Sequence, residues 1–326
     1  MSEDFERRVM PYRRELLAHC YQMLGSVHDA EDLVQETLLR AWRAYDRYDD
    51  ARASMRTWLY RIATNTCLTA LESRRRRPTP SGLGSPGDDP RAPLVPDLEV
   101  PWLEPLPDAL VDGDPASVVL ARGQLRLALV AAMQHLPARQ RAILLMREVL
   151  GWSAAEAADA LETTPAAVNS GLQRARARLD ALGIGADHVA EPVTAEQRTV
   201  VDRYVTAFVA GDLAAVGQLL AQDVVLEMPP VPAWYRGPDD YVAFLAHVFD
   251  RRGTDWQMVP VRSNGQAAVA AYVRESETYR LHSLQVFTVS AGRVAGTMVF
   301  TDPATLAMFA VPAELVRTGG TPAGRR

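Results

Sequence analysis

Apolar residues near the start of the chain recur with helical spacing. Between Leu16 and Leu24 they return every three or four positions, and the same period continues over residues 29–45 and 54–74. Because an α-helix has about 3.6 residues per turn, this pattern predicts three amphipathic helices. The last of them ends in a run of four arginines just before Pro78.

A second helical segment is interrupted at short intervals. Apolar spacing predicts helices over 136–150, 153–161 and 164–182, with Gly151 between the first two. Ser153 and Glu156 have the spacing of a capping box, in which each side chain bonds the other residue's backbone. Two short helices followed by a third that carries arginines are typical of a helix-turn-helix that reads DNA.

The pattern changes again in the C-terminal part, where helical and alternating periods mix. We expect helices over 194–210, up to residue 220, and over 238–250. Strands are expected at 224–228, 256–262, 267–274, 281–289 and 293–300. This mixture predicts a small α+β domain over 194–314, followed by a disordered tail at 315–326.

Proline and charge separate these modules. Ten of the 22 prolines lie between Pro78 and Pro115, and residues 78–119 hold one arginine against eight acidic residues. Such a composition sustains neither helix nor sheet, so it predicts an extended acidic linker. The fold class is therefore multidomain: two all-α modules, 1–77 and 120–183, joined by this linker and followed by the α+β domain.

The overall composition excludes several classes of protein. Apolar residues make up 48% of the chain, which is ample for packed cores, and a formal net charge of −5 excludes a basic nucleic-acid coat. Two cysteines form neither a disulfide framework nor a structural zinc site, so we expect no metal and no cofactor. No apolar run approaches the roughly 18 residues of a membrane span, which favours a cytoplasmic protein without membrane contact.

Polar residues on two of the N-terminal helices are candidate binding groups. Asp32, Gln35 and Glu36 share one face of the 29–45 helix, where they form either a docking surface for a basic partner or a solvated face. The 54–74 helix offers aromatic, amide and guanidinium groups, which suit unpaired bases and phosphates. An alternative is that Trp58 belongs to the core and that the arginine run only adds solubility. The residues concerned are Arg56, Trp58, Arg61, Asn65, Arg74 and Arg75.

The last helix of the second module carries the groups that read duplex DNA. Asn and Gln side chains pair with adenine, Arg pairs with guanine, and further polar groups hold phosphates. Helix-turn-helix geometry also occurs in plain helical bundles, but the arginine spacing favours DNA. The candidate residues are Thr164, Asn169, Ser170, Gln173, Arg174, Arg176 and Arg178.

Three segments in this order resemble one family. DAEDLVQETLLRAW, SMRTWLYRIATNTCLTALESRRRR and the segment from LPARQRAILLM to QRARARL are similar to sigma-70 family RNA polymerase sigma factors of the extracytoplasmic-function type. The resemblance implies that Asp32, Leu33, Gln35 and Glu36 dock on the clamp helices of the largest polymerase subunit. It also implies that the Trp58–Asn65 helix melts the promoter −10 element and that the final helix-turn-helix reads the −35 element.

The chain departs from that family at several positions. Met55 stands where Phe is usual, Thr69 where Asp is usual, and Asn169-Ser170-Gly171 where Lys-Ser-Arg is usual. Two phosphate-binding cations are thereby lost from the last helix. We therefore expect weak intrinsic −35 affinity and a promoter unlike that of commoner members.

The linker contains an apolar motif that is unusual in a tether. Trp102, Leu103, Glu104 and Pro105 resemble the tryptophan- and proline-containing linker motif of sigma factors with a fused C-terminal domain. An exposed Trp in such a segment lowers solubility, so we expect the motif to dock. The alternative is a chance apolar cluster.

The C-terminal domain resembles the SnoaL-like branch of the nuclear-transport-factor-2 superfamily, a cone of curved sheet over helices. Such cones often enclose a pocket, and some members are isomerases or cyclases. The candidate acid-base groups are Asp223, Glu227, Tyr235, Asp255, Tyr272 and His282, but no spacing singles out a catalytic pair. The candidate pocket residues, which core packing explains equally well, are Met228, Pro229, Pro230, Trp234, Tyr235, Trp256 and Phe287.

The resemblances lead to one main expectation and two alternatives. The main expectation is a monomeric, non-enzymatic sigma factor that binds core polymerase and promoter DNA, and whose C-terminal domain regulates it by intramolecular contacts. The alternatives are a sensor of a small molecule in the C-terminal domain and a SnoaL-like enzyme with a DNA-binding appendage. A sensor would shift a closed–open equilibrium by its ligand's differential affinity, whereas an enzyme requires a buried acid-base pair.

Overall fold

The computed structural model describes residues 3–73, 76–112, 125–182 and 195–316. The chain divides into two compact units, and each is described separately. The first combines Met1–Thr79 with Glu99–Pro192, and the second combines Pro80–Leu98 with Val193–Arg326. The linker is therefore shared, since its first part packs with the C-terminal domain and its second part with the helical modules. Together the helical unit and the α+β unit confirm the expected multidomain fold class.

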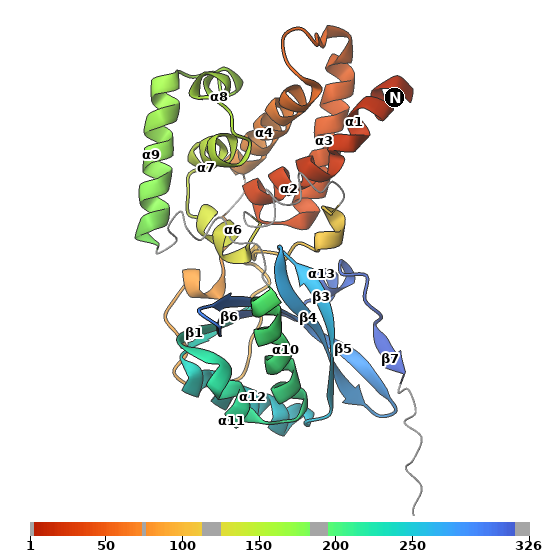
Figure 1. Ribbon diagram of the computed structural model, residues 1–326, viewed down its shortest axis with the longest axis vertical. Coiled ribbons are helices and arrows are strands. Elements are labelled where there is room, and N and C mark those ends of the chain that lie inside the picture. The colour runs from red at the N-terminus through yellow and green to blue at the C-terminus, as the bar shows by residue number, and fades with distance from the viewer. Residues whose placement is uncertain (1–2, 74–75, 113–124, 183–194, 317–326) are drawn as a thin grey trace, which may run out of the picture. The chain divides into compact units, whose positions relative to one another are not determined.

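The N-terminal part of the first unit is a helical bundle in which α2, α3 and α4 pack on one another (Figure 1). Gly25, at a φ of 73°, ends α2, and the Ser26 hydroxyl then caps α3 by accepting a hydrogen bond from Asp29 N at 3.1 Å. The helices are α1 (Glu3–Val9), α2 (Arg13–Leu24), α3 (Val27–Ala44) and α4 (Met55–Ser73), with 3₁₀ turns at Met10–Tyr12 and Tyr45–Arg47.

The second part of this unit has the expected helix-turn-helix order. Ser153 and Glu156 form the predicted capping box of α8, and Thr164 caps α9, which begins at Pro165. The predicted helix over 136–150 is α-helical only in its first half and then widens into a π-helical turn at Leu145–Val149. The helices are α6 (Leu127–Met133), α7 (Ala138–Leu144), α8 (Ala154–Ala160) and α9 (Pro165–Ala181).

A buried arginine joins the two parts of the first unit. Arg141 of α7 is 4% exposed and donates to the Met23 carbonyl of α2, to Met133 O at 2.9 Å and to Gln134 Oε1 at 2.8 Å. Burial lowers its pKa to about 10. These neutral acceptors satisfy its donors, so the buried guanidinium is hydrogen-bonded although no carboxylate pairs with it among the described residues.

The second unit is a curved sheet with helices packed on it (Figure 1). The strand order is β2-β1-β6-β5-β4-β3, with β7 added on β5, and only β1 and β6 run parallel among the described strands. The strands are β1 (Leu220–Met228), β2 (Val231–Arg236), β3 (Trp256–Ser263), β4 (Gln266–Glu275), β5 (Thr278–Ser290), β6 (Arg293–Phe300) and β7 (Glu314–Val316).

The helices of this unit build its core together with the sheet. α10 (Ala195–Val209) contacts β3 to β6, and α12 (Pro238–Arg252) contacts β1 and β2, while α11 (Leu213–Leu219) lies between these helices. α13 (Pro303–Ala307) follows β6. Aromatic rings fill the interior, with Tyr204, Phe208, Tyr241 and Phe287 all at most 2% exposed. This arrangement leaves a cavity between α12 and the sheet.

Two strands were not expected from the sequence. β2 lies between the prolines at 229–230 and Gly237. β7 includes Leu315 and Val316, which the sequence analysis assigns to the disordered tail. The rest of that tail, 317–326, lies outside the described residues. The linker residues 113–124 lie outside them as well. Among the described helices, none combines the length and the apolar character that crossing a bilayer requires.

Candidate polymerase, promoter and ligand sites

The acidic patch on α3 is accessible. Asp32 and Gln35 are exposed and Glu36 is half-buried, whereas Leu33 is 9% exposed and packs inward. Glu36 accepts a hydrogen bond from Arg40 one turn later, at 2.6 Å. The patch therefore presents three polar side chains on a rigid helix, with Leu33 fixing their position from below.

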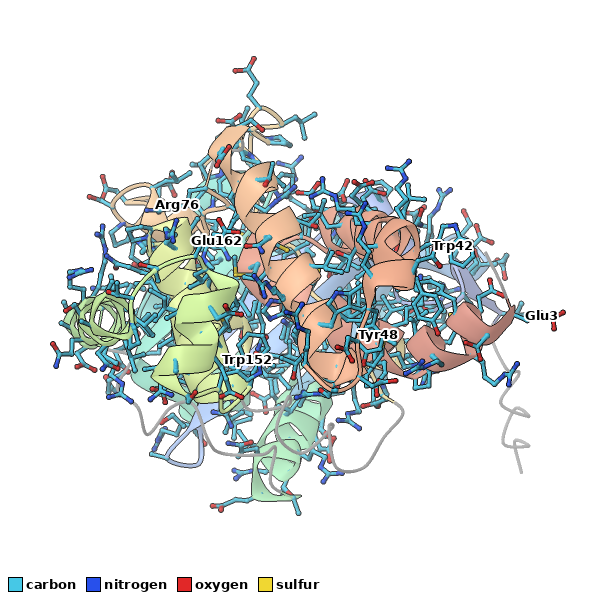
Figure 2. All side chains as sticks on the ribbon, turned by 90° about the horizontal axis from the view of Figure 1, so that it is seen from above. Glu3, Trp42, Tyr48, Arg76, Trp152 and Glu162 are labelled. Carbon is cyan, nitrogen blue, oxygen red and sulfur yellow. The ribbon has the colours of Figure 1, made fainter. Side chains whose placement is uncertain are left out.

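The first residues of α4 are held by neighbours within the bundle. Arg56 donates to Glu15 at 2.8 Å and lies over the Tyr60 ring at 4.8 Å. Trp58 is half-buried, and its ring packs on Tyr48 at a centroid distance of 4.8 Å; Tyr48 lies beside the start of α4 in Figure 2. The half-buried Trp58 side chain therefore packs in the bundle and still has accessible surface.

The next polar residues of α4 contact the helix-turn-helix. Arg61 donates to Asp159 of α8 at 2.9 Å, and the side-chain amide of Asn65 donates to the Ala160 carbonyl at 3.4 Å. In this arrangement α8 occupies the side of α4 that we expected to face DNA. Arg74 and Arg75, also expected there, lie outside the described residues.

The face of α9 that we expected to read DNA is open. Its polar side chains point away from the bundle, and only Arg176 has an ion-pair partner, Glu148, among the described residues. Thr164 is exposed as well and caps the helix through its hydroxyl. The exposed members are Asn169, Ser170, Gln173, Arg174, Arg176 and Arg178.

Position 171 has a structural reason for being glycine. A Cβ atom built on Gly171 would lie 2.6 Å from Ile143 Cδ1 of α7, and the residue is buried. Gly171 shares the inward face of α9 with Val168 and Leu172. Of the two positions where the family's usual cation is missing, only 169 is exposed, so only there could a cation reach a phosphate without repacking the helix.

The apolar linker motif is seated on the first unit. Trp102 is 8% exposed, Leu103 is 1% exposed and Pro105 is buried. Glu104 joins the motif to the start of α3, because its backbone N–H donates to Gly25 O at 3.0 Å and its carbonyl accepts from Tyr21 Oη at 2.7 Å.

The Glu104 carboxylate completes the N-terminal cap of α3. It accepts hydrogen bonds from Ser26 Oγ at 3.0 Å, from Val27 N at 2.8 Å and from His28 Nδ1 at 3.1 Å. The N-terminus of a helix presents unpaired N–H groups and a positive dipole end, so a carboxylate is stabilised there. The linker thus adds a second carboxylate to the one that Asp29 supplies in the first turn of α3.

Arg77 is the residue of this anchor that the sequence analysis missed. It donates to Asp29 at 2.7 Å, to Glu104 at 3.2 Å and to the Trp102 carbonyl at 2.9 Å. We had grouped it with the arginine run after α4. The sequence gives no local signal for this role, because Arg77 and Trp102 are 25 positions apart and only the fold of the linker brings them together.

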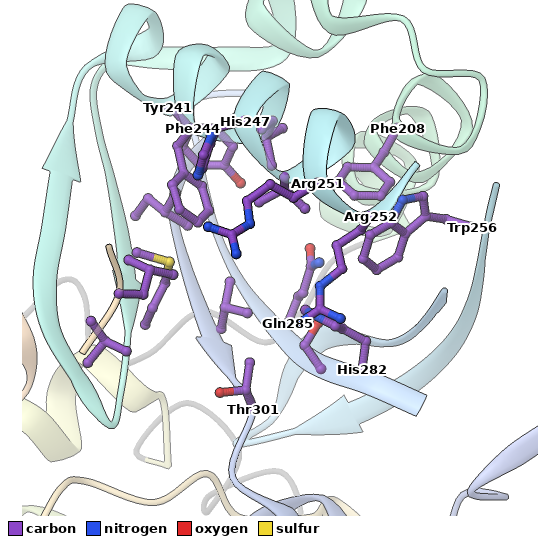
Figure 3. Close-up of a pocket in the computed structure, with 18 of the residues that line it drawn as sticks. Phe208, Tyr241, Phe244, His247, Arg251, Arg252, Trp256, His282, Gln285 and Thr301 are labelled. Atoms are coloured by element: carbon purple, nitrogen blue, oxygen red, sulfur yellow. The ribbon is translucent and has the colours of Figure 1, made fainter. Parts of the chain in front are cut away.

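The second unit contains a cavity of about 470 Å³ between α12 and the sheet (Figure 3). Its wall is mostly aromatic and aliphatic, and residues 92–96 of the linker, Val95 excepted, form part of it. Tyr241 Oη donates to Thr297 at 2.9 Å and lies 2.9 Å from Tyr204 Oη. Burial raises the pKa of Tyr241 to about 12, so these hydroxyls stay protonated.

Two buried polar atoms at this cavity lack a hydrogen-bond partner among the described residues: His282 Nδ1 and Gln285 Oε1. Gln285 is 6% exposed. Burial, together with the nearby Arg252 guanidinium, lowers the pKa of His282 to about 4, so its ring is neutral near pH 7.

The structure corrects most of the pocket residues expected from the sequence. Met228 and Trp256 line the cavity, but Trp234 and Tyr235 bond to the linker carbonyls of Gly84 and Asp89 instead. Pro229, Pro230 and Phe287 are not in the wall, and Phe287 packs against Tyr204 in the core.

Of the six acid-base candidates, the cavity holds only His282. Asp223 is exposed, Glu227 accepts from Ser81 N at 2.9 Å, and Asp255 pairs with Arg274 at 3.0 Å. Tyr272 donates to the Pro312 carbonyl at 2.9 Å. The described wall contains no carboxylate.

Known protein families match all three parts of the chain. Sigma-70 region 2 matches residues 8–77, Sigma-70, region 4 matches 126–179, and the SnoaL-like domain matches 201–297. These matches cover the bundle, the helix-turn-helix and the curved sheet described above.

Relatives match most of the length of the chain. ECF RNA polymerase sigma factor SigG of Mycobacterium tuberculosis (strain ATCC 25618 / H37Rv) is 48% identical over 315 residues, which is 96% of this chain and 85% of that protein. ECF RNA polymerase sigma factor SigJ of the same strain is 30% identical over 249 residues, or 74% and 72% of the two chains. The crystal structure of Mycobacterium tuberculosis SigJ covers 93% of this chain and 98% of that one, with a TM-score of 0.64 and 23% identity, which shows a shared fold. This chain therefore belongs to the ECF RNA polymerase sigma factors, which bind core RNA polymerase and promoter DNA, and carries a fused C-terminal SnoaL-like domain.

Proposed function

We propose that this sigma factor is held in a closed form in which its promoter-melting surface is covered, and that the SnoaL-like domain regulates release from that form. The observation that carries the proposal is the contact of Arg61 and Asn65 with α8. A base or phosphate needs the same donors, so α8 and the −10 strand compete for them. Core docking through Asp32, Gln35 and Glu36 remains open in the closed form.

The linker is the proposed connection between the regulatory domain and the closed form. Residues 80–98 pack with the SnoaL-like domain, and residues 99–112 pack with the helical unit. The second part is fastened at the start of α3 through Glu104 and Arg77. A change in the SnoaL-like domain that pulls on residues 80–98 therefore acts on the base of the polymerase-docking helix.

We assign the SnoaL-like domain a regulatory rather than a catalytic role. Acid-base catalysis in an apolar pocket needs a carboxylate or an equivalent group opposite a hydrogen-bond donor. The described cavity wall offers His247 and His282 but no Asp or Glu, and the relatives reported above are sigma factors. As a polymerase subunit, the chain acts in the cytoplasm, one copy per polymerase.

The test is run-off transcription with core polymerase, comparing the full chain with truncations after Leu182 and after Val193. Promoter-dependent transcripts from the full chain are expected at a low level, with higher output from the truncated forms. A loss of output on truncation would show that the domain is part of the active form and would overturn the proposal that it regulates release from a closed form. Absence of core binding by every form would overturn the assignment of the docking patch.

A further inference from the structure

We infer that the cavity of the SnoaL-like domain is a binding site for an apolar carboxylate anion, and that the linker segment 92–96 is part of this site. The inference deepens the proposed function and rests on it for the regulatory consequence, since it supplies the signal that the domain would read. Four observations carry it: the cavity's size and wall, two arginines at its opening, its unpartnered polar atoms, and the path of the linker.

The cavity has the dimensions and the wall of a small-molecule site. Pockets for such ligands measure roughly 300–1,000 Å³ and are mainly apolar with a few polar groups, and this one measures about 470 Å³. Rings from three elements line it: Phe208 of α10, Phe244 of α12 and Trp256 of β3. An apolar body of matching size gains free energy by leaving water for this wall.

Two arginines at the end of α12 select for negative charge. Figure 3 shows the side chains of Arg251 and Arg252 reaching toward the cavity, with Arg252 ending near His282. Both are exposed, and neither forms an ion pair within the described part of the chain. The described wall has no carboxylate, and Glu275, which acts on His282 from outside it, pairs with Arg280 at 3.4 Å. The two arginines therefore give this end of the cavity positive charge that a carboxylate headgroup complements.

The unpartnered polar atoms give a bound molecule two places to form hydrogen bonds. Gln285 lines the cavity and is only 6% exposed, and its side-chain oxygen Oε1 accepts no hydrogen bond from the described residues. A buried polar atom without a partner costs roughly 1–3 kcal/mol of stability. His282 Nδ1 can carry the ring proton and donate it to a carboxylate oxygen, whereas Gln285 Oε1 only accepts and takes its hydrogen bond from a water molecule that accompanies the ligand.

The linker crosses the cavity between two fixed points. On one side Gly87 N donates to Trp234 O at 2.7 Å, and on the other Asp97 N donates to Pro230 O at 2.9 Å. Between them, Pro93, Leu94 and Pro96 face the cavity. A ligand that fills the space therefore contacts the same linker whose continuation is fastened to α3.

Ligand binding can be measured on the full chain with a neutral reporter. N-phenyl-1-naphthylamine fluorescence reports occupation of an apolar site, and decanoate and decan-1-ol serve as competitors that share an apolar chain and differ in charge. Decanoate is expected to displace the dye at a concentration at least tenfold lower than decan-1-ol. Equal competition by the acid and the alcohol would overturn selection for an anion.

Two pairs of variants locate the site. The double variant Arg251→Gln/Arg252→Gln is expected to bind decanoate about tenfold more weakly and the neutral dye with unchanged affinity. The matched control is Arg198→Gln, at an exposed arginine of α10 that does not line the cavity. Leu94→Asp places a carboxylate in the wall and is expected to weaken decanoate at least tenfold, whereas Val95→Asp, at a neighbouring residue outside the wall, leaves it unchanged. Equal effects within either pair would place the anion elsewhere.

Run-off transcription separates this inference from the proposed function. Decanoate is expected to change the output of the full chain and to leave that of the form truncated after Leu182 unchanged. If truncation alters transcription but decanoate neither binds nor acts, the inference fails and the proposed function stands. If decanoate binds without changing output, the role of the linker as the connection is overturned.

Discussion

Arg61 of α4 and Asp159 of α8 form an ion pair at 2.9 Å across 98 positions of the sequence. The pair places α8 against the face of α4 that we propose binds the −10 element. Its side chains are 42% and 76% exposed, so solvent screens it and its contribution is at most about 1 kcal/mol. In the proposed closed form, a contact of this strength would yield readily to a competing ligand such as DNA.

Weakening this pair should favour the open form. Asp159→Asn removes the charge and Asp159→Arg reverses it, and we expect run-off transcription to rise by up to about fivefold, which corresponds to about 1 kcal/mol. The reversal is expected to have the larger effect because it adds repulsion from Arg61. Asp180→Asn, an exposed carboxylate of α9, is the matched control. If the control raises output equally, the effect arises from reduced negative charge near DNA and not from opening.

The linker anchor should depend on the charge of Glu104. Glu104→Gln keeps the shape but removes the charge from a group that is 18% exposed and bonded to Ser26, Val27 and Arg77. Hydrogen bonds to charged groups contribute about 1.5–3 kcal/mol. We expect the free energy of unfolding of the helical unit to fall by about 2 kcal/mol in urea titrations.

The control for this substitution is Glu72→Gln, an exposed residue at the end of α4 without a partner in the described chain. Its effect is expected to stay within about 0.5 kcal/mol. A loss of stability that is the same for both variants would show that Glu104 acts only through the net charge of the unit.

Gly25 and Gly151 allow the linker contact to be separated from backbone strain. Both have positive φ, 73° and 68°, so an alanine is strained at either site by about 1 kcal/mol. A Cβ at Gly25 would also lie 2.9 Å from Leu103 Cδ1 and 3.1 Å from Gln134 Nε2, whereas nothing lies within 4 Å at Gly151. Gly25→Ala is therefore expected to lower the melting temperature clearly more than Gly151→Ala. Equal shifts would mean that Leu103 yields without cost.

The last helix allows a test of the expected weak −35 affinity. Asn169 is exposed, so Asn169→Lys adds a cation that can reach a phosphate, and the salt slope of duplex binding should steepen by about one unit. Gly171→Arg should bring no such gain, because a side chain there meets Ile143. Binding to a −35 duplex at several salt concentrations distinguishes the two. A steeper slope for Gly171→Arg would contradict the packing argument.

Local chemistry explains which parts of the fold were predictable. The Ser153–Glu156 capping box and the Thr164 cap depend on residues three positions apart, and both were found from sequence. β2 was missed because prolines flank and interrupt it, which ordinarily indicates a loop. The π-helical turn at Leu145–Val149 has no local signal, since its extra residue per turn is accommodated by packing.

The sites were predictable to the extent that one helix carries them. The residues of the polar face of α9 could be predicted from their spacing. The contact that Arg61 makes could not, because its partner Asp159 lies 98 positions further along the chain. Arg251 and Arg252 have the position of ordinary cations at a helix C-terminus, which favour the helix dipole. Their proposed role in binding an anion can be inferred only from the cavity that they line.

Acid should destabilise the helical unit through His19. This residue of α2 is 2% exposed, its Nε2 lies 2.9 Å from Thr64 Oγ1, and burial, aided by the Arg56 guanidinium, lowers its pKa to about 4. In the unfolded chain the pKa is about 6.5, so between pH 6.5 and 4 the unfolded state binds a proton that the native state does not. The free energy of unfolding attributable to His19 is therefore unchanged above pH 6.5 and falls by about 1.4 kcal/mol per pH unit toward pH 4. His19→Gln should remove this part of the slope in urea titrations between pH 7.5 and 4.5, and a variant with the full wild-type slope would show that His19 titrates normally in the native protein.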